Sequence, residues 1–318
     1  MTTLRAVFFG TPEFAVPSLS AMHDAGVEVP LVVTQPDRPS GRHATPRPSP
    51  IAMMAQARGI AVAKPERLRG NVEILERIRQ IAPDAGIVVA YGMLLPNALL
   101  DLPRLSFVNV HASLLPKYRG ASPVQAAILA GDSETGVVTM RIVEELDAGP
   151  IYLERRVPIG EGEDAGSLSR RLAAAGALVL LETLRGLEAG TLQARPQTGE
   201  PSFCRPIRRE QGEVDWALPA AVLERRLRAY TPWPGLHTFL GNERVKIVGA
   251  GIGPGGRRQQ PGTFWTEGGK LLAAAGEGTS LELRVLQRAG RKSVSGADFA
   301  LGAKLPGRFG RAINAPGS

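Results

Sequence analysis

The strongest constraint on the fold is an alternation of strand-like and helix-like segments over residues 1–189. Short runs rich in Val, Ile and Phe are separated by longer stretches with helical spacing. Because these runs are continuously apolar, they are typical of parallel strands covered on both faces. The β–α–β order predicts an open, doubly wound α/β sheet. The expected strands are residues 5–10, 29–35, 85–91, 107–112 and 136–143.

The stretches between these strands predict helices. The clearest are residues 12–25, 72–81 and 167–187, the last with its leucines near one stripe. Thr11 is a good N-cap residue, with Pro12 at the first helical position. This helix start would suit a phosphate. A plain strand-to-helix turn is the preferred explanation, because "GTPEFA" lacks the G-x-G-x-x-G pattern of dinucleotide sites.

The second part of the chain has a different pattern. Residues 190–209 are rich in turn formers, have no clear period and end in basic residues, which indicates a linker. One helix is expected at 219–229, followed by short strand-like pieces between glycine-rich turns. Such pieces predict a small barrel or sandwich. The expected organisation is therefore 1–189, a linker at 190–209, and a second domain at 210–318.

Positive charge is concentrated in this second part. Residues 190–318 hold 19 basic and 10 acidic side chains, whereas residues 1–189 hold 19 and 20, so the second part carries the excess behind the net charge of +8. Such an asymmetry favours a polyanionic partner, most commonly nucleic acid. The alternative is an ordinary solvated surface in an arginine-rich protein, because only six of the 38 basic residues are lysines.

Composition narrows the class of protein further. A single cysteine, Cys204, excludes an internal disulfide and suits a reducing cytosol. With four histidines beside it, a metal site is not expected. The longest apolar run contains Pro96 and is shorter than the roughly 18 residues that a membrane span needs. The N-terminus lacks the apolar region of a signal peptide. We therefore expect a cytoplasmic protein with no metal and no membrane partner.

Residues 36–50, "PDRPSGRHATPRPSP", form a proline-rich insertion for which no regular element is predicted. A loop of this length without structure is uncommon and often functional. A disordered surface insertion is the alternative. The side chains of the insertion that can carry positive charge are Arg38, Arg42, His43 and Arg47.

Two polar side chains occur at the end of the apolar strand 107–112. Asn109 and His111 are two residues apart and so share one face of the strand. Ligands of open α/β sheets bind beyond the carboxyl ends of the strands. Asp147 follows the next expected strand, 136–143, and would therefore reach the same edge. The sequence predicts that these three side chains come together.

The three side chains suit attack of an external nucleophile on a carbonyl group. An Asn amide donates to a developing oxyanion. A His carries protons near neutral pH, and an Asp orients the His and raises its pKa. Ser113 lacks the G-x-S-x-G context of a nucleophile. By chemistry alone, structural hydrogen bonding at a strand end is the preferred explanation of the Asn–His pair.

The same stretch carries a family resemblance. "VNVHASLLPKYRG" resembles the signature of the folate-dependent formyltransferases, and "ELDAGP" resembles their second motif. Seven further segments, in order along the whole chain, are similar to the branch that acts on initiator tRNA. They are "FFGTPEFAVPSL", "VVTQPDRPSGR", "VVAYGMLLP", "GDSETGVVTM", "DWALPAAVLERRLRAYTPWPG", "PGTF" and "AGRKSVSGADF". The resemblance implies a Rossmann-like, mostly parallel catalytic domain, a linker and a small OB-like β-barrel domain.

The resemblance also implies substrates and residues. The donor would be 10-formyltetrahydrofolate, and the acceptor would be the α-amino group of methionyl initiator tRNA, on a monomeric enzyme. The catalytic trio would be Asn109, His111 and Asp147. The folate would contact the loop Ser113, Leu114, Leu115 and Pro116 and the backbone around Val89, Ala90 and Tyr91. The tRNA would contact the insertion through Arg38, Arg42 and Arg47.

Three features leave the tRNA contacts open. His43 and Ala44 follow Arg42, where family members carry more basic residues, so Arg47 would substitute in part. The linker residues Arg205, Arg208 and Arg209 are either phosphate contacts or ordinary solvated charge. The aromatic residues Trp216, Tyr230 and Trp233 suit base stacking, although packing is the preferred explanation.

The expected reaction is direct attack of the neutral methionyl amine on the formyl carbon. Asn109 and a protonated His111 would stabilise the tetrahedral oxyanion, and Asp147 would keep His111 charged and relay a proton through water. Rival functions are formylation of glycinamide ribonucleotide or of an amino sugar, and hydrolysis of formyltetrahydrofolate. A non-catalytic RNA-binding protein is a rival of another class, and it would not require the three polar side chains.

Overall fold

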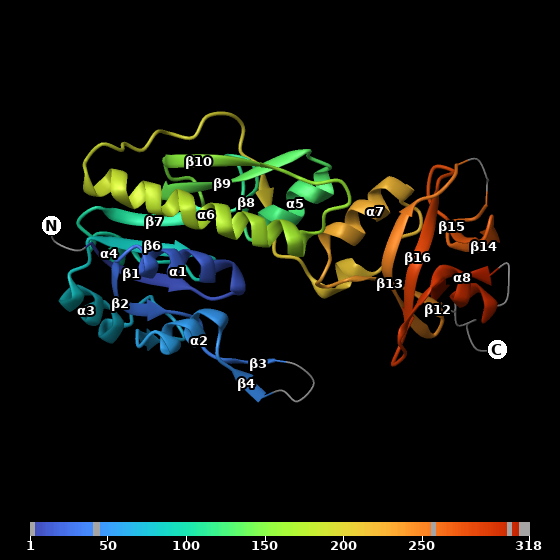
Figure 1. The fold of residues 1–318 in the computed structure, drawn as a ribbon, viewed down its shortest axis with the longest axis horizontal. Coiled ribbons are helices and arrows are strands. Elements are labelled where there is room, and N and C mark those ends of the chain that lie inside the picture. Colours follow the sequence, from blue (N-terminus) through green and yellow to red (C-terminus); the bar gives the residue numbers. More distant parts are fainter. Residues whose placement is uncertain (1–3, 41–44, 256–258, 304–306, 312–318) are drawn as a thin grey trace. The chain divides into compact units, whose positions relative to one another are not determined.

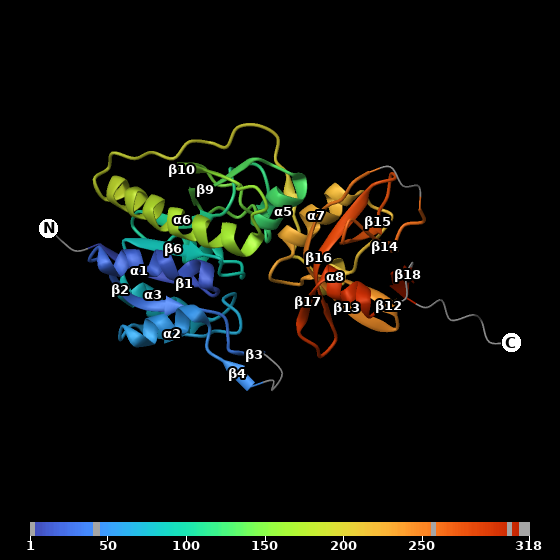
Figure 2. The same cartoon turned by 45° about the vertical axis from the view of Figure 1, so that its right-hand side comes forward.

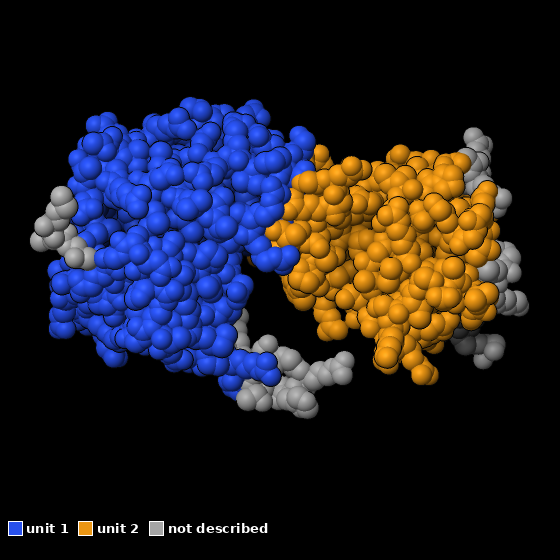
Figure 3. Space-filling model, in the orientation of Figure 1, with its two compact units in different colours: residues 1–124, 133–159, 168–205 blue, residues 125–132, 160–167, 206–318 orange. Residues whose placement is uncertain are grey.

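The computed structural model describes residues 4–40, 45–255, 259–303 and 307–311. The chain divides into two compact units (Figure 3). The first unit comprises residues 1–124, 133–159 and 168–205, and the second comprises residues 125–132, 160–167 and 206–318. The predicted domain boundaries at 189 and 210 stay a prediction, and residues 190–205 pack within the first unit.

In the described residues, the first unit is built on a seven-stranded sheet in the order β10–β9–β7–β6–β1–β2–β5 (Figure 1). Its strands are β1 (Arg5–Gly10), β2 (Glu28–Val33), β5 (Ala61–Ala63), β6 (Ala85–Val89), β7 (Ser106–His111), β9 (Glu134–Arg141) and β10 (Ile151–Pro158). The strands from β7 to β5 are mutually parallel. The predicted doubly wound, mostly parallel α/β sheet is confirmed.

Strand β9 is the exception, because it runs antiparallel to both β7 and β10. A continuously apolar run shows that both faces of a strand are buried, but it does not encode the direction of the strand. Strand β10 was not expected, since its sequence "IYLERRVP" mixes apolar and charged residues at the edge of the sheet.

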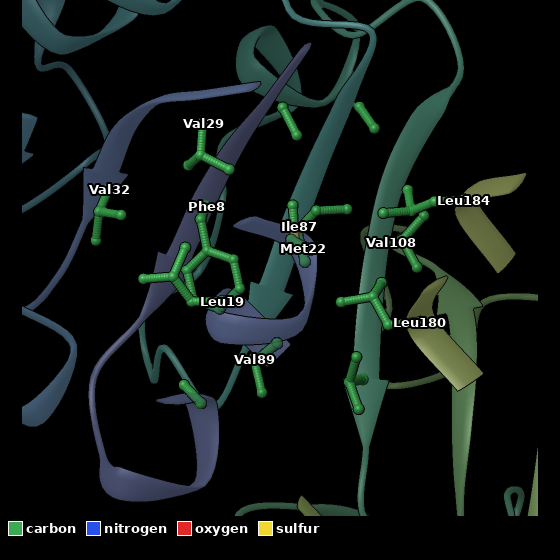
Figure 4. Packing of buried hydrophobic residues seen from close by; sticks show 14 of the residues in the cluster. Phe8, Leu19, Met22, Val29, Val32, Ile87, Val89, Val108, Leu180 and Leu184 are labelled. Atoms are coloured by element: carbon green, nitrogen blue, oxygen red, sulfur yellow. The ribbon is translucent and has the colours of Figure 1, made fainter. Parts of the chain in front are cut away.

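Helices cover both faces of this sheet. On one face, α1 (Val16–Asp24), α2 (Pro50–Ala57) and α6 (Ala165–Glu188) cover a buried cluster (Figure 4). Labelled members of this cluster are Phe8, Leu19, Met22, Val29, Val32, Ile87, Val89, Val108, Leu180 and Leu184. On the other face, α3 (Val72–Ile81) and α4 (Asn97–Leu100) cover a second cluster that includes Phe9, Leu31 and Phe107.

The alternation of side chains along β7 assigns each residue to one of these faces. Val108 and Val110 point into the α1–α6 cluster, whereas Phe107 belongs to the cluster under α3. Asn109 and His111 therefore lie on the Phe107 face, near the point where the strand ends.

The predicted helices occur with small shifts, except at the start of α1. A 3₁₀ turn (Glu13–Ala15) precedes this helix, and Thr11 does not cap it. The Thr11 hydroxyl instead donates to the carbonyl oxygen of Tyr91 at 3.3 Å. The N-cap prediction is wrong, because the Thr11 hydroxyl bonds to Tyr91, which follows strand β6, and not to a backbone N–H of the helix.

The insertion at 36–50 contains a short ribbon. Strand β3 (Arg38–Ser40) pairs antiparallel with β4 (Thr45–Arg47), so the prediction of no regular element is wrong (Figure 2). Pro39 lies opposite Pro46. Prolines are tolerated in a ribbon where the backbone nitrogens point away from the partner strand. Arg42 and His43 lie outside the described residues.

The second unit contains a mainly antiparallel half-barrel in the order β18–β14–β15–β16–β13–β12–β19, with β17 beside β16. The prediction of a small β-domain is confirmed. Its elements are 3₁₀ helix η2 (Arg209–Gly212), α7 (Ala220–Ala229), β12 (Leu236–Gly241), β13 (Glu243–Ile252), β14 (Thr263–Glu267), β15 (Lys270–Ala274), β16 (Ser280–Arg288), β17 (Ser293–Ser295), α8 (Gly296–Leu301), β18 (Gly307–Arg308) and β19 (Gly310–Arg311).

The aromatic residues of the second unit divide between packing and exposure. Trp216 is buried, stacks on Phe309 and donates from Nε1 to Thr238 at 3.0 Å. Tyr230 is buried as well, whereas Trp233 is 56% exposed. Packing therefore accounts for the first two, and Trp233 alone of the three presents its ring to solvent. Within the described ranges, no helix is both long and apolar enough to cross a membrane.

Candidate active site

Strand β7 carries two polar side chains near its carboxyl end, among apolar residues of the sheet. Asn109 pairs in register with Met140, and His111 pairs with Val138. The amide of Asn109 is half-buried and makes no hydrogen bond to any described residue. Its two N–H donors are therefore available to a ligand.

The imidazole of His111 is buried, and its tautomer follows from its partners. Nε2 lies 3.0 Å from the carbonyl oxygen of Tyr118, which can only accept a hydrogen bond. Nε2 therefore carries a proton, and Nδ1 is the nitrogen that titrates. Nδ1 lies 3.7 Å from Oδ2 of Asp147. This distance is too long for a direct hydrogen bond, but one water or amine nitrogen can bridge the two groups.

Asp147 reaches His111 by a route that the sequence did not predict. Because β9 is antiparallel to β7, its carboxyl end at Arg141 lies beside Val108, nearer the start of β7. The segment 142–150 then turns back, with Asp147 in the left-handed region at φ 49°. Oδ2 of Asp147 accepts from the Gly120 backbone N–H at 2.7 Å. The three predicted side chains do come together, although the expected parallel geometry was wrong.

Burial and charge act in opposite directions on the pKa of His111. Burial lowers this pKa, while the Asp147 carboxylate and the Tyr118 carbonyl raise it, and burial is the larger effect. Burial therefore opposes the expected effect of Asp147 and favours the neutral ring in the free protein. The expectation that Asp147 holds His111 charged stays a prediction. Asp147 stabilises the imidazolium once Nδ1 has accepted a proton.

The predicted folate loop follows β7 directly and is well packed. The Ser113 hydroxyl is buried and donates to the Lys117 carbonyl at 2.5 Å, which shapes the turn. Leu115 packs in a small cluster with Val138 and Met140. Leu114 and Pro116 are half-buried. The loop thus lies beside the Asn109–His111 pair, and its binding role stays a prediction.

The second predicted folate segment ends the neighbouring strand β6. Val89 and Tyr91 are buried, and Ala90 is exposed with φ 48°. Burial raises the pKa of Tyr91 to about 12, so its phenol stays neutral. The Tyr91 carbonyl accepts from the Gln35 amide at 2.7 Å. Because β6 pairs with β7, this backbone lies at the same edge of the sheet as His111.

The predicted tRNA contacts are on the surface wherever they are described. Arg47 is exposed on β4, opposite the backbone of Arg38 on β3. Arg205, Arg208 and Arg209 are also exposed, and within the described ranges none of these three forms an ion pair. Arg42 cannot be placed, because it lies outside the described residues.

Two residues that contact Asp147 or its neighbours were not predicted. Gln197, in the expected linker, donates to the Asp147 carbonyl at 2.7 Å, and Arg119 donates to Gln197. A lone glutamine among turn formers carries no signal in a single sequence. Across the described chain, no group of three or more His, Cys, Asp or Glu residues could hold a metal ion.

Comparison with known proteins places the chain in a family. Residues 4–184 match the formyl transferase family, and residues 206–304 match the formyl transferase C-terminal domain family. The methionyl-tRNA formyltransferase of Acidobacterium capsulatum is 44% identical over 303 residues, covering 95% of this chain and 97% of its own. That of Thermus thermophilus is 45% identical over 299 residues, covering 94% and 96%.

Solved structures show the same fold at lower identity. An N-formyltransferase from Helicobacter canadensis, in complex with folinic acid and dTDP-3-aminofucose, aligns with TM-score 0.64 and 16% identity, covering 90% of this chain and 100% of its own. HypX from Aquifex aeolicus, with tetrahydrofolic acid, aligns with TM-score 0.60 and 16% identity, covering 94% and 47%. The resemblance seen in the sequence is thus confirmed, and the chain belongs to the methionyl-tRNA formyltransferase family.

Proposed function

We propose that this chain transfers the formyl group of 10-formyltetrahydrofolate to the α-amino group of methionyl initiator tRNA. The observation that carries the proposal is the convergence of Asn109, His111 and Asp147 at one edge of the sheet. Relatives of about the same length that carry this activity in their names support the acceptor. The fold of the folate-bound neighbours supports the donor site.

The chemistry follows from the partners of each side chain. The neutral amine attacks the formyl carbon, a C–N bond forms, and the carbonyl electrons move to oxygen. The free amide of Asn109 donates to that oxyanion. The attacking amine loses its proton to Nδ1 of His111, directly or through a bridging water, and Asp147 stabilises the resulting imidazolium. The bond from the formyl carbon to N10 then breaks, N10 takes the proton, and tetrahydrofolate leaves.

The tRNA is proposed to contact exposed arginines. Arg205, at the end of the first unit, and Arg208 and Arg209, at the start of the segment 206–318, are the exposed candidates, with Arg38, Arg42 and Arg47 proposed for the insertion. Phosphate contacts of this kind supply affinity that falls with salt. The basic residues 190–318 favour this partner over a small acceptor. We further propose that the protein acts in the cytoplasm and that it is a monomer, and sedimentation of the purified chain would test its oligomeric state.

One assay separates this proposal from its rivals. Formyl transfer from 10-formyltetrahydrofolate to aminoacylated initiator tRNA is measured beside three controls: free methionine, glycinamide ribonucleotide and water alone. Transfer to the tRNA, with much slower reaction in the controls, is expected. Preferred transfer to the ribonucleotide would assign the other formyltransferase activity. Release of formate without an acceptor would assign a hydrolase, and tRNA binding without any transfer would leave a binding protein.

A further inference from the structure

The segment that follows α6 returns along the edge of the sheet and contacts the loops that hold the site. Figures 1 and 2 show it running back past β10. Arg195 pairs with Ile151 at the start of β10. Farther along, β11 (Phe203–Cys204) pairs with β8 (Arg119–Gly120). This segment, residues 195–204, lies within the first compact unit and is called the brace below.

We propose that Gln197, on the brace, is a positioning residue that holds the Asp147 carboxylate against His111. The inference rests on the proposed roles of Asp147 and His111. Gln197 donates both of its amide hydrogens to one turn: to the carbonyl oxygen of Asp147 at 2.7 Å and to that of Gly149 at 2.9 Å. The amide thereby clamps the backbone on both sides of Ala148.

The partners of Gln197 fix the orientation of its amide group. Both carbonyls can only accept hydrogen bonds, and the guanidinium of Arg119 can only donate them. Oε1 of Gln197 accepts from Nη2 of Arg119 at 2.9 Å and from Nε at 3.2 Å. Both N–H donors and the oxygen of the Gln197 amide are therefore hydrogen-bonded. Arg119 is itself buried, so this arrangement is locked by packing as well as by hydrogen bonds.

The turn at residues 147–149, which Gln197 holds, has a backbone conformation that is unfavourable without such contacts. Asp147 adopts φ 49°, a left-handed conformation that costs a residue with a side chain free energy. Gly149 packs so closely that a Cβ there would lie 1.7 Å from the carbonyl oxygen of Arg141. A backbone held at 147 and 149 leaves the Asp147 side chain little freedom, which keeps Oδ2 at 3.7 Å from Nδ1 of His111.

The brace also positions the second contact of the Asp147 carboxylate. Gly120 donates its N–H to Oδ2, and its φ of +119° suits glycine. A Cβ at Gly120 would lie 2.3 Å from the carbonyl oxygen of Cys204 on the brace. Close pairing of β8 with β11 therefore fixes the direction of this N–H. Both supports of Asp147, through its backbone and through its carboxylate, depend on the same returning segment.

The test compares Gln197→Met, Gln197→Glu and the matched control Gln193→Met in the full-length chain. Gln193 is exposed just before the brace and makes no hydrogen bond to a described residue. Gln197→Met keeps the length of the side chain and loses every hydrogen bond. Gln197→Glu keeps a partner for Arg119 but places an oxygen opposite two carbonyl oxygens. The readouts are kcat, the KM of each substrate, and the pKa of the His111 ring from an NMR titration.

Both Gln197 variants should lower kcat by on the order of 10²-fold, since small misplacements of a reacting group cost about that much. Their KM values should stay near those of the parent, and Gln193→Met should match the parent throughout. In Gln197→Met the pKa of His111 should fall further, because the carboxylate moves away. Full kcat in Gln197→Glu would overturn the clamp, as would a loss of stability in Gln197→Met without change in the pKa of His111. Unchanged activity in Asp147→Asn would instead remove Asp147 from the mechanism, and an absence of formyl transfer to charged initiator tRNA by the parent protein would refute the proposed function.

Discussion

Nδ1 of His111 lies 3.7 Å from Oδ2 of Asp147, while Nε2 of the same ring is held by the Tyr118 carbonyl at 3.0 Å. Nε2 is thereby fixed as a hydrogen-bond donor. Nδ1 faces the Asp147 carboxylate at a distance that one bridging water or amine nitrogen can span. Since burial lowers the pKa of the ring and so favours its neutral form, this pair is suited to accept a proton during the reaction.

Substituting Asn109 tests the oxyanion donor. Asn109→Ala should lower kcat by on the order of 10²–10³-fold, because one preformed donor to an oxyanion contributes about that much. The affinity for tRNA should be nearly unchanged. Asn97→Ala, at an exposed position of α4, serves as the control. Steady-state kinetics on charged initiator tRNA give the comparison, and a parental kcat in Asn109→Ala would remove this residue from the mechanism.

Asp147→Asn should lower the pKa of His111 as well as the rate. The Asp147 charge opposes the effect of burial, so its removal leaves burial acting with less opposition and the neutral ring persists to lower pH. An NMR titration of the ring protons measures this shift, since the chain has only four histidines. A pKa that rises or stays constant would show that the carboxylate does not act on the ring.

The exposed arginines that follow the brace should determine part of the salt dependence of tRNA binding. A plot of log K against log salt should be linear, and its slope should become shallower by about 1 for each phosphate contact removed. The triple change Arg205→Gln, Arg208→Gln and Arg209→Gln is compared with Arg104→Gln, whose side chain pairs with Asp84. Equal slopes for the two proteins would assign these arginines to ordinary solvated surface.

Gly86→Ala should destabilise the catalytic unit. A Cβ at Gly86 would lie 2.2 Å from the ring of Phe107, which is buried between the strands and α3 and packs against Phe9. Overpacking of this kind typically costs about 1–3 kcal/mol of unfolding free energy. Urea unfolding measures the effect, with Gly255→Ala as a control because nothing lies within 4 Å of its added Cβ. Equal midpoints would show that the Phe107 ring moves aside freely.

Much of the architecture was predictable because local patterns carry it. The apolar runs predicted β1, β2, β6, β7 and β9, and helical spacing predicted α3 with its observed ends. The Asn109–His111 pair was recognisable from its spacing alone, since residues two apart on a strand share a face. Strand order added Asp147 to the pair, and the family motifs added the catalytic role of the three residues and the substrates, which no pattern of burial could indicate.

The sequence by itself therefore determined the sheet, the face of β7 that carries the polar pair, and the family. Tertiary structure decided the direction of β9, the route of Asp147 back to His111, and the burial that lowers the pKa of that ring. It also decided that Gln197 and Gly120 on distant segments support one carboxylate. Side-chain period is a property of each segment, whereas strand direction, burial of charge and long-range hydrogen bonds depend on which segments pack together.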